Sequence, residues 1–300
     1  MRISFSAADQ YAKCSLQYFF NRRRKIPVPE VGWAMPYGSV IHLSLENLHN
    51  SIKSPTELML KSELIEEFVE NWANEHMTND MNITNAEMES STKMGIQMLE
   101  AYYDKHYGTE WFNPPLDITI KGETQKGTEL WFEVPLIDLS TGEVLLEDHV
   151  LIGKIDLINT FNSMILATDH KTAGRKYSDE QVANSNQLTF YIYVLKYLIA
   201  EGNIKNSDNL DVGACFSVLY KLKKPWVEVY PTSRVNADIR RLVAVLTAAI
   251  KGIESDIFVP ADGNMPCSWC DYKEACRLWG TTDDWEEIYL KKIGKSHGEK

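Results

Sequence analysis

The sequence of 300 residues lacks a long hydrophobic run. A membrane-spanning helix needs roughly 18 or more consecutive apolar residues, whereas the densest apolar stretch, Leu188–Ala200, is interrupted by Lys196. The first residues, Met1–Phe5, also lack the apolar centre and the small-residue cleavage site of a signal peptide. We therefore expect a cytoplasmic protein with no membrane partner.

Positive charge is scarce. The chain has 31 Lys and Arg against 42 Asp and Glu, which gives a formal net charge of -11. Nonspecific coating of nucleic acid depends on Lys and Arg contacts to phosphates, so the composition excludes a protein of that kind. Three local basic runs are present, and each alone is also explained as solvated surface: Arg22–Lys25, Lys171–Lys176 and Lys221–Lys224.

Apolar periodicity divides the chain into a mostly helical first third and a strand-rich remainder. Helices are expected at Ser6–Arg24, Tyr37–Leu48, Pro55–His76 and Ala86–Tyr107. After Pro114, strands are expected at Leu116–Lys121, Leu130–Leu139, Val150–Asn159, Met164–Asp169, Val212–Tyr220 and Trp226–Tyr230, with helices at Ser178–Ala200 and Val235–Asp256. This order predicts an α/β fold in which helices flank a mixed sheet.

The same shifts predict four stretches within one compact unit. Residues 1–113 form a helical region packed on the core, residues 114–258 the sheet-bearing core, and residues 259–280 a cysteine-bearing loop. Residues 281–300 form a charged tail whose last residues fray.

Three of the five cysteines, Cys267, Cys270 and Cys276, form a C-x2-C-x5-C pattern. Such spacing lets two sulfurs face one metal and is typical of zinc and iron–sulfur sites. A closed site needs a fourth ligand. Cys215 lies in an apolar run, where a buried thiol packs as a small hydrophobe, whereas Cys14 lies beside polar residues on a predicted amphipathic helix, which suits a ligand. Spacing alone leaves zinc, iron–sulfur and unrelated free thiols open.

Two aspartates, Asp156 and Asp169, lie on consecutive predicted strands that a short turn joins. Antiparallel pairing would bring their carboxylates close together, and two such carboxylates favour a magnesium or manganese site because they repel without a cation. Lys171 faces the same side as Asp169 and can orient an attacking water or stabilise charge on a phosphate. The alternative is a surface ion pair, but the strands are otherwise apolar and charge there is costly.

Two helices carry further candidate residues. Gln187 and Tyr191 are four residues apart and share a face, where they could bind phosphate or support a catalytic lysine; alternatively, Tyr191 is core and Gln187 is solvated. His42, Glu46 and His49 recur on one face of an earlier helix. One of these imidazoles could complete a metal shell, although such a stripe is more often an exposed polar face.

These residues, in this order, resemble the RecB-like branch of the PD-(D/E)xK nucleases, and within it the iron–sulfur exonucleases of the CRISPR-associated and AddB types. His42 matches an upstream helix histidine of the family, and one cysteine followed by three matches its cluster ligands. The three motifs are Gly153-x-x-Asp156, Asp169-x-Lys171 and Gln187-x3-Tyr191. No single motif is specific, but the ordered set spans nearly the whole chain. One departure is Ser15, where many relatives have proline.

The resemblance implies a restriction-endonuclease-like fold and a metal-dependent DNA exonuclease that acts on single-stranded ends in recombination, replication or CRISPR adaptation. The implied ligands of Mg²⁺ or Mn²⁺ are His42, Asp156, Asp169 and the backbone carbonyl of His170. The implied catalytic residues are Asp156, Asp169, Lys171, Gln187 and Tyr191. The implied ligands of a [4Fe–4S] cluster that clasps the chain ends are Cys14, Cys267, Cys270 and Cys276.

The chain has no G-x4-G-K-[ST] phosphate-binding loop, so any unwinding of DNA requires a helicase partner. Recombination or CRISPR proteins are further expected partners, and a homo-oligomer stays open. One alternative is a noncatalytic DNA-end or partner-binding module that retains the fold and the cluster. The set of Asp156, Asp169 and Lys171 argues against it, because a pure binder does not need all three. A second alternative is a zinc-stapled enzyme of unrelated chemistry, which a brown protein with broad visible absorbance would exclude.

Overall fold

The computed structural model describes residues 1–29, 32–78, 83–205, 207, 210–261, 267–268 and 270–295. The chain divides into two compact units, each assembled from separate stretches. The first unit is Met1–Val31, Pro135–Ile152 and Arg240–Lys300, and the second is Gly32–Val134 and Gly153–Ile239. The linear division expected from the sequence stays a prediction. None of the described helices is long and apolar enough to cross a membrane.

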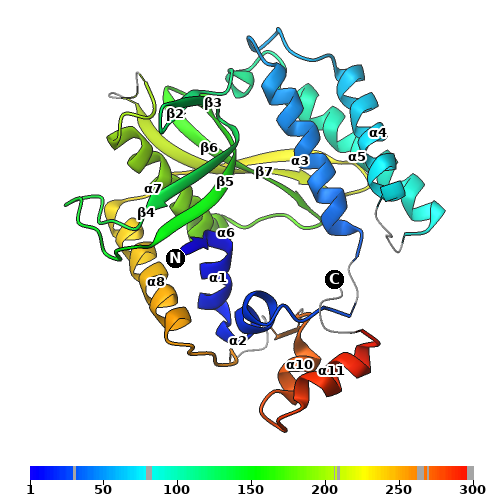
Figure 1. Cartoon of the computed structure of the whole chain (residues 1–300). Helices are drawn as coiled ribbons and strands as arrows, with labels where there is room; N and C mark the ends of the chain where they lie inside the picture. The colour runs from blue at the N-terminus through cyan, green and yellow to red at the C-terminus, as the bar shows by residue number, and fades with distance from the viewer. Residues whose placement is uncertain are drawn as a thin grey trace. The chain divides into compact units, whose positions relative to one another are not determined.

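A mixed sheet forms the centre of the second unit (Figure 1). Its strands are β4 (Thr128–Pro135), most of β5 (Val150–Phe161), β6 (Met164–Ala173), β7 (Asp211–Tyr220) and β8 (Trp226–Thr232). They follow the order β5-β6-β7-β8, and β4 also pairs with β5. The β5–β6 and β7–β8 pairs are antiparallel, whereas β6 and β7 are parallel. The predicted mixed sheet is therefore confirmed.

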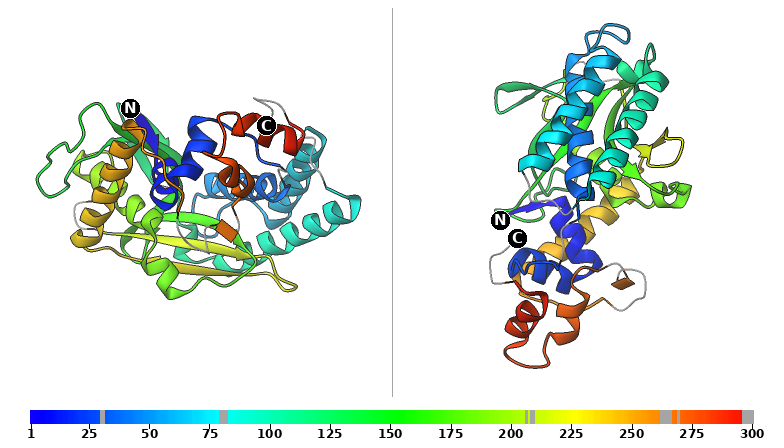
Figure 2. Two further views of the ribbon diagram at one scale, coloured as in Figure 1. Left: turned by 90° about the horizontal axis from the view of Figure 1, so that it is seen from below. Right: turned by 90° about the vertical axis from the view of Figure 1, so that its right-hand side faces the viewer.

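Helices flank this sheet on both faces. The helices α3 (Ala34–Ser51), α4 (Lys61–Thr78) and α5 (Asn85–His106) lie side by side (Figures 1 and 2), and α7 (Asn186–Ala200) packs on β6 and β7. Successive strand residues point to opposite faces. Leu166 of β6 and Cys215 of β7 accordingly join the apolar core with α3–α5, whereas Asp169 meets the α7 side chain Tyr191. Alternation thus directs Asp169 away from the α3–α5 core.

Smaller elements complete the second unit: η2 (Glu110–Phe112), α6 (Asp179–Ala183), and a two-stranded sheet of β2 (Asp117–Ile120) and β3 (Glu123–Lys126). The sequence did not predict β3, because its four residues are all exposed and show no alternation of apolar and polar side chains. The predicted helix Ser178–Ala200 is divided, because Ser185 accepts a hydrogen bond from the Leu188 N–H and caps α7.

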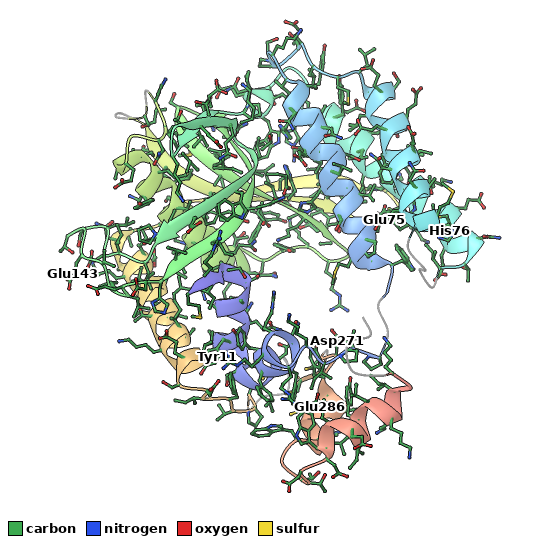
Figure 3. The ribbon with its side chains drawn as sticks, viewed as in Figure 1. Tyr11, Glu75, His76, Glu143, Asp271 and Glu286 are labelled. Carbon is green, nitrogen blue, oxygen red and sulfur yellow. The ribbon has the colours of Figure 1, made fainter. Side chains whose placement is uncertain are left out.

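The first unit contains β1 (Arg2–Ser4), α1 (Phe5–Lys13), α2 (Ser15–Tyr18), the π-helix η1 (Phe19–Arg23), α8 (Asn236–Glu254), α10 (Lys273–Leu278) and α11 (Trp285–Ile293). β1 pairs in parallel with the start of β5. Chain segments far apart in the sequence share one apolar core there, made of Leu16, Phe20, Ile26, Tyr272, Ala275, Tyr289 and Leu290. Glu286 of α11 (Figure 3) accepts a hydrogen bond from Nε of Arg24 at 3.0 Å.

One sequence prediction for this unit is wrong. The helix predicted at Ser6–Arg24 breaks at Cys14, whose backbone is extended (φ -160°, ψ 102°) and whose sulfur accepts a hydrogen bond from the Gln17 N–H at 3.4 Å. Cys14 therefore caps α2 and does not lie within a helix. The helix α11 lies within residues 281–300, and its Tyr289 and Leu290 bury apolar surface in the unit's core. The expected charged tail stays a prediction.

Candidate active site

The β5–β6 hairpin brings the two aspartates of the sequence prediction together. Its turn is Asn162–Ser163, with φ of 49° and 59°, which suits the right-handed twist of a two-residue hairpin. The registered pairs run from Phe161↔Met164 to Leu157↔Thr168. Asp156 and Asp169 follow directly, and Asp156 Oδ2 accepts a hydrogen bond from the backbone N–H of His170 at 2.8 Å. The predicted antiparallel pairing is confirmed.

Gly153 explains the spacing of the Gly-x-x-Asp motif on β5. A Cβ atom at this position would lie 2.7 Å from the ring of Phe132 on β4. Real Cβ atoms do not approach that closely, so only glycine lets Phe132 pack over β5 three residues before Asp156.

Burial and the charge of Asp169 perturb the protonation of Asp156. Burial, followed by the negative charge of Asp169, raises the pKa of Asp156 well above its ordinary value. Lys171 partly compensates the negative charge of Asp169, because its Nζ lies 2.6 Å from Asp169 Oδ2. Burial alone would lower the pKa of Lys171, but the charges of Asp169 and Asp156 more than offset it and raise that pKa. Lys171 is therefore a cation held against a nearly buried carboxylate.

Gln187 and Tyr191 hold the other oxygen of Asp169. Gln187 Nε2 donates to Asp169 Oδ1 at 2.7 Å, and the Tyr191 hydroxyl donates to the same atom at 3.0 Å. The two side chains also contact each other at 3.3 Å. Their shared helix face is as the sequence predicts, and their partner in the structure is the aspartate rather than the lysine. Asp169 thus has both oxygens occupied and a fixed orientation.

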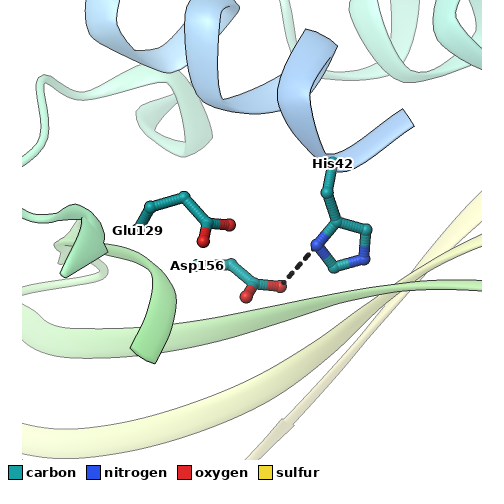
Figure 4. A group of neighbouring side chains, drawn as sticks. All are labelled: His42, Glu129 and Asp156. Atoms are coloured by element: carbon teal, nitrogen blue, oxygen red, sulfur yellow. Dashed lines mark ion pairs between the residues drawn. The ribbon is translucent and has the colours of Figure 1, made fainter. Parts of the chain in front are cut away.

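His42 approaches Asp156 from α3. Its Nδ1 lies 3.3 Å from Asp156 Oδ2, and Figure 4 shows the two side chains pointing toward each other beside Glu129. One ligand atom from each of His42, Glu129 and Asp156 lies within 4.8 Å of the others. Burial lowers the pKa of His42, which favours the neutral imidazole that binds metal ions.

Glu129 is the member of this group that the sequence analysis missed, because it precedes the predicted strand Leu130–Leu139. The backbone of Glu129 has φ 44°, a conformation that non-glycine residues rarely adopt and that concentrates at functional sites. Gly127, two residues earlier, approaches the Ile158 carbonyl so closely that a Cβ atom would lie 2.7 Å from it. The only sequence signal was a glutamate close to a glycine at a strand start, which is weak by itself.

The histidine and glutamate stripe of α3 divides between two environments. His42 and Glu46 line a cavity of about 440 Å³ together with Met35, Gly38, Ser39, Leu43, Glu129 and Asp156. Burial and the charge of Glu129 raise the pKa of Glu46. His49 instead lies in the core, where its Nε2 is 2.8 Å from the Tyr102 hydroxyl and burial lowers its pKa to about 3.

The side chain of His170 is only 3% exposed and stacks on His49, with the ring centroids 5.7 Å apart. Both of its ring nitrogens are buried and unpartnered within the described structure. Burial lowers the pKa of this imidazole well below its ordinary value. The side chain therefore anchors the strand in the core, and only the backbone of His170 is oriented by Asp156.

Four cysteines surround a second cavity, in the first unit. Cys14, Cys267, Cys270 and Cys276 all line a space of about 220 Å³. No three of these sulfurs, which all belong to described residues, lie within 4.8 Å of one another. Burial and then the neighbouring thiols raise the pKa values of Cys270 and Cys276. Cys215 is fully buried next to Thr168, and burial raises its pKa to about 12, as expected for a thiol that acts as a small hydrophobe.

Residues 2–277 match the protein family described as the PD-(D/E)XK nuclease superfamily. The chain therefore belongs to the PD-(D/E)XK nuclease superfamily. Among solved structures, it is similar to a crystal structure named "Putative exonuclease" from Eubacterium rectale, with 10% sequence identity and a TM-score of 0.47. That similarity covers 94% of this chain and 89% of the other. No curated protein sequence matches the chain significantly.

Proposed function

We propose that this nuclease is a metal-dependent DNA exonuclease that hydrolyses phosphodiester bonds at single-stranded ends. One observation carries the proposal: Asp169 is clamped by Gln187, Tyr191 and Lys171, beside the His42, Glu129 and Asp156 group. A noncatalytic binding surface does not need a buried carboxylate oriented on both oxygens. The preference for single-stranded ends rests on the resemblance of the ordered motifs.

The donor set fits a hard divalent cation such as Mg²⁺ or Mn²⁺. Carboxylate oxygens with one imidazole are typical ligands for these ions. A cation would also offset the burial and the negative charge of Asp169 that together raise the pKa of Asp156. The proposed ligands are His42, Asp156, Asp169 and the backbone carbonyl of His170, with Glu129 as an additional ligand. A bound cation would polarise the phosphate and favour deprotonation of the attacking water.

Besides the proposed metal ion, Lys171 supplies positive charge to the active site. Its raised pKa keeps the ammonium group protonated near neutral pH, so it can donate to a phosphate oxygen on which negative charge grows. The lysine is 32% exposed, so a substrate can reach it. Gln187 and Tyr191 line the site and keep Asp169 in one orientation through hydrogen bonds to a single oxygen.

The four-cysteine cavity supports a [4Fe–4S] cluster on Cys14, Cys267, Cys270 and Cys276. A tetrahedral zinc site with Zn–S bonds of about 2.3 Å places its sulfurs roughly 3.8 Å apart, closer than the arrangement of these thiols. The cavity of about 220 Å³ also exceeds several times the ~30 Å³ of a water molecule. A wide thiol cage of this kind favours a multi-atom cluster over one ion. The proposed role of the cluster is structural, because its ligands come from parts of the chain that lie far apart in the sequence.

The test is degradation of end-labelled single- and double-stranded DNA by anaerobically purified protein in Mg²⁺ or Mn²⁺. Lys171→Ala should bind DNA and cut about 100- to 1,000-fold more slowly, whereas Lys205→Ala, an exposed lysine of the same unit, should cut like wild type. The label position distinguishes exonuclease from endonuclease products. Wild-type protein that carries its cluster, binds DNA and cuts nothing would establish the noncatalytic module instead.

A further inference from the structure

Two of the three basic runs in the sequence meet at one end of the sheet in the second unit. β6 and β7 are parallel, so their carboxyl ends lie at the same edge: Ala173 is registered with Tyr220, and the Lys221 N–H donates to the Ala173 carbonyl at 2.8 Å. We call the cations at this end the basic edge. It consists of Arg175, Lys176, Lys221, Lys223 and Lys224.

Most of this charge is uncompensated. Among the described residues, only Lys176 of the basic edge has an ion-pair partner, Glu228 at 3.3 Å. Several lysines elsewhere in the unit are paired with carboxylates, as Lys61 is with Asp104 at 2.8 Å. No described carboxylate forms an ion pair with the other four cations of the basic edge, and three of these four are exposed. Such a concentration of positive charge in a chain of net charge -11 favours an external polyanion.

Aromatic side chains connect the basic edge to the active site. Lys171 Nζ lies 5.9 Å from the ring centroid of Phe216, and Phe216 packs edge-on against Tyr177 at 5.4 Å. The Tyr177 N–H donates to the Tyr220 hydroxyl at 3.0 Å, and Tyr220 stacks on the partly exposed Trp226 with centroids 4.5 Å apart. This ring network fixes the surface between the lysine and the basic edge. Phe216 and Tyr220 are buried and support this surface, whereas Tyr177 and Trp226 are partly exposed beside the cations. Exposed aromatic rings among cations are typical of single-strand binding surfaces.

Lys171 is registered with Val218 of β7, and Lys221 lies three residues further along, which is roughly 10 Å at about 3.3 Å per residue. We propose that the basic edge binds the backbone phosphates of a single DNA strand as it extends from the scissile bond at Lys171. This inference rests on the proposed nuclease function and adds the path of the substrate to it. The strand would leave the active site along the carboxyl ends of β6 and β7.

The test compares two double variants that remove equal charge from exposed positions. Lys223→Gln/Lys224→Gln alters the basic edge. The control is Lys93→Gln/Lys205→Gln, which changes two exposed lysines elsewhere in the same unit, the first of them on α5. Affinity for a fluorescent 20-nucleotide single strand is measured against salt in full-length protein with Lys171→Ala added to suppress cutting. Wild-type cleavage of the same strand is measured in parallel.

Each phosphate contact to a single strand contributes about 0.7 to the slope of log K against log salt. Loss of two contacts should therefore reduce the slope by about 1.4 and weaken binding about 25-fold at 0.1 M salt, while the control pair stays within twofold of its parent. Equal slopes and affinities for the two pairs would overturn the basic-edge inference and leave the nuclease function standing if wild type cuts. Wild type that cuts nothing in Mg²⁺ or Mn²⁺ would remove the proposed function, and this inference with it.

Discussion

Deleting one hydroxyl group tests whether the site depends on the orientation of Asp169. Tyr191→Phe keeps a ring that is 5% exposed and removes the hydroxyl that donates to Asp169 Oδ1 at 3.0 Å and accepts from Gln187 Nε2 at 3.3 Å. A hydrogen bond to a charged group contributes about 1.5–3 kcal/mol, and 1.4 kcal/mol corresponds to a factor of ten. Because Gln187 still donates to the same oxygen at 2.7 Å, we expect the lower end of that range, a loss of about 10- to 30-fold in cleavage rate.

The assay is single-turnover cleavage of end-labelled single-stranded DNA across a Mn²⁺ titration. Residues that orient a metal ligand change both metal affinity and rate, typically by 10- to 100-fold, so the Mn²⁺ midpoint of Tyr191→Phe should rise as well. Tyr197→Phe removes a hydroxyl from the same helix that, in the described structure, forms no hydrogen bond to Asp169. This control should keep the wild-type rate and midpoint.

Combining Tyr191→Phe with Gln187→Ala tests the shared oxygen directly. Both donors meet on Asp169 Oδ1 and contact each other at 3.3 Å, so their effects should not add. The double variant should release the carboxylate and lose more rate than the product of the single losses. If each single variant stays within twofold of wild type, the orientation of Asp169 by α7 is unimportant and the reasoning about this clamp fails.

Three further predictions follow from other parts of the molecule. Glu129→Gln should raise the Mn²⁺ midpoint of cleavage about tenfold or more with unchanged DNA affinity; an unchanged midpoint would remove Glu129 from the ligand set. Cys276→Ser should lose iron and broad visible absorbance and up to about 5 kcal/mol of unfolding free energy, the upper value for closing so long a loop, whereas Cys215→Ala should keep its iron; equal iron in both would exclude the four-cysteine cluster. Burial lowers the pKa of His106 to about 3 in the folded chain. The contribution of neutral His106 to the free energy of unfolding is therefore fully present above pH 6.5 and is lost as the pH falls toward 3. At pH 5.5 the loss is about 1.4 kcal/mol. Between pH 7.5 and 5.5, the free energy of unfolding measured in urea should therefore fall less for His106→Gln than for wild type. Equal decreases in the two proteins would contradict a neutral, buried His106.

The part of the site that follows from local spacing was predictable. Strand alternation and a short turn are enough to place Asp156 near Asp169, because register in a hairpin is set by the turn and the apolar pattern. Helical spacing is likewise enough to put Gln187 and Tyr191 on one face. The sequence does not contain the identity of their partner, since Asp169 reaches them only after α7 packs on β6. Local pattern thus predicts which residues share a face but not what that face meets.

Features that depend on tertiary context escaped prediction. The stripe of His42, Glu46 and His49 looks like one face of a helix, yet α3 is covered on more than one side, and His49 finds Tyr102, 53 residues away, as its partner. Glu129 enters the site through a left-handed backbone conformation that no propensity favours. In the first unit, the helix break at Cys14 was likewise not predictable from the apolar pattern. It depends on the Cys14 sulfur, which accepts a hydrogen bond from the Gln17 N–H at the start of α2.

The net charge of the chain says little about what either surface of the second unit binds, because exposed charges are screened over about 8–10 Å at physiological ionic strength. Around His42, Glu129 and Asp156, the acidic groups include Glu129, Asp156 and Asp169, and the cations that partly compensate them are Lys171 and Lys154. Under the proposed function, such a site would repel a phosphate until a divalent cation binds. The basic edge begins roughly 10 Å from Lys171 along β7, at about one screening length, so its cations can hold a strand while adding little charge to the reaction centre. If both proposals hold, the opposite demands of binding a polyanion and binding a metal ion are met by separating the two sites along one pair of strands.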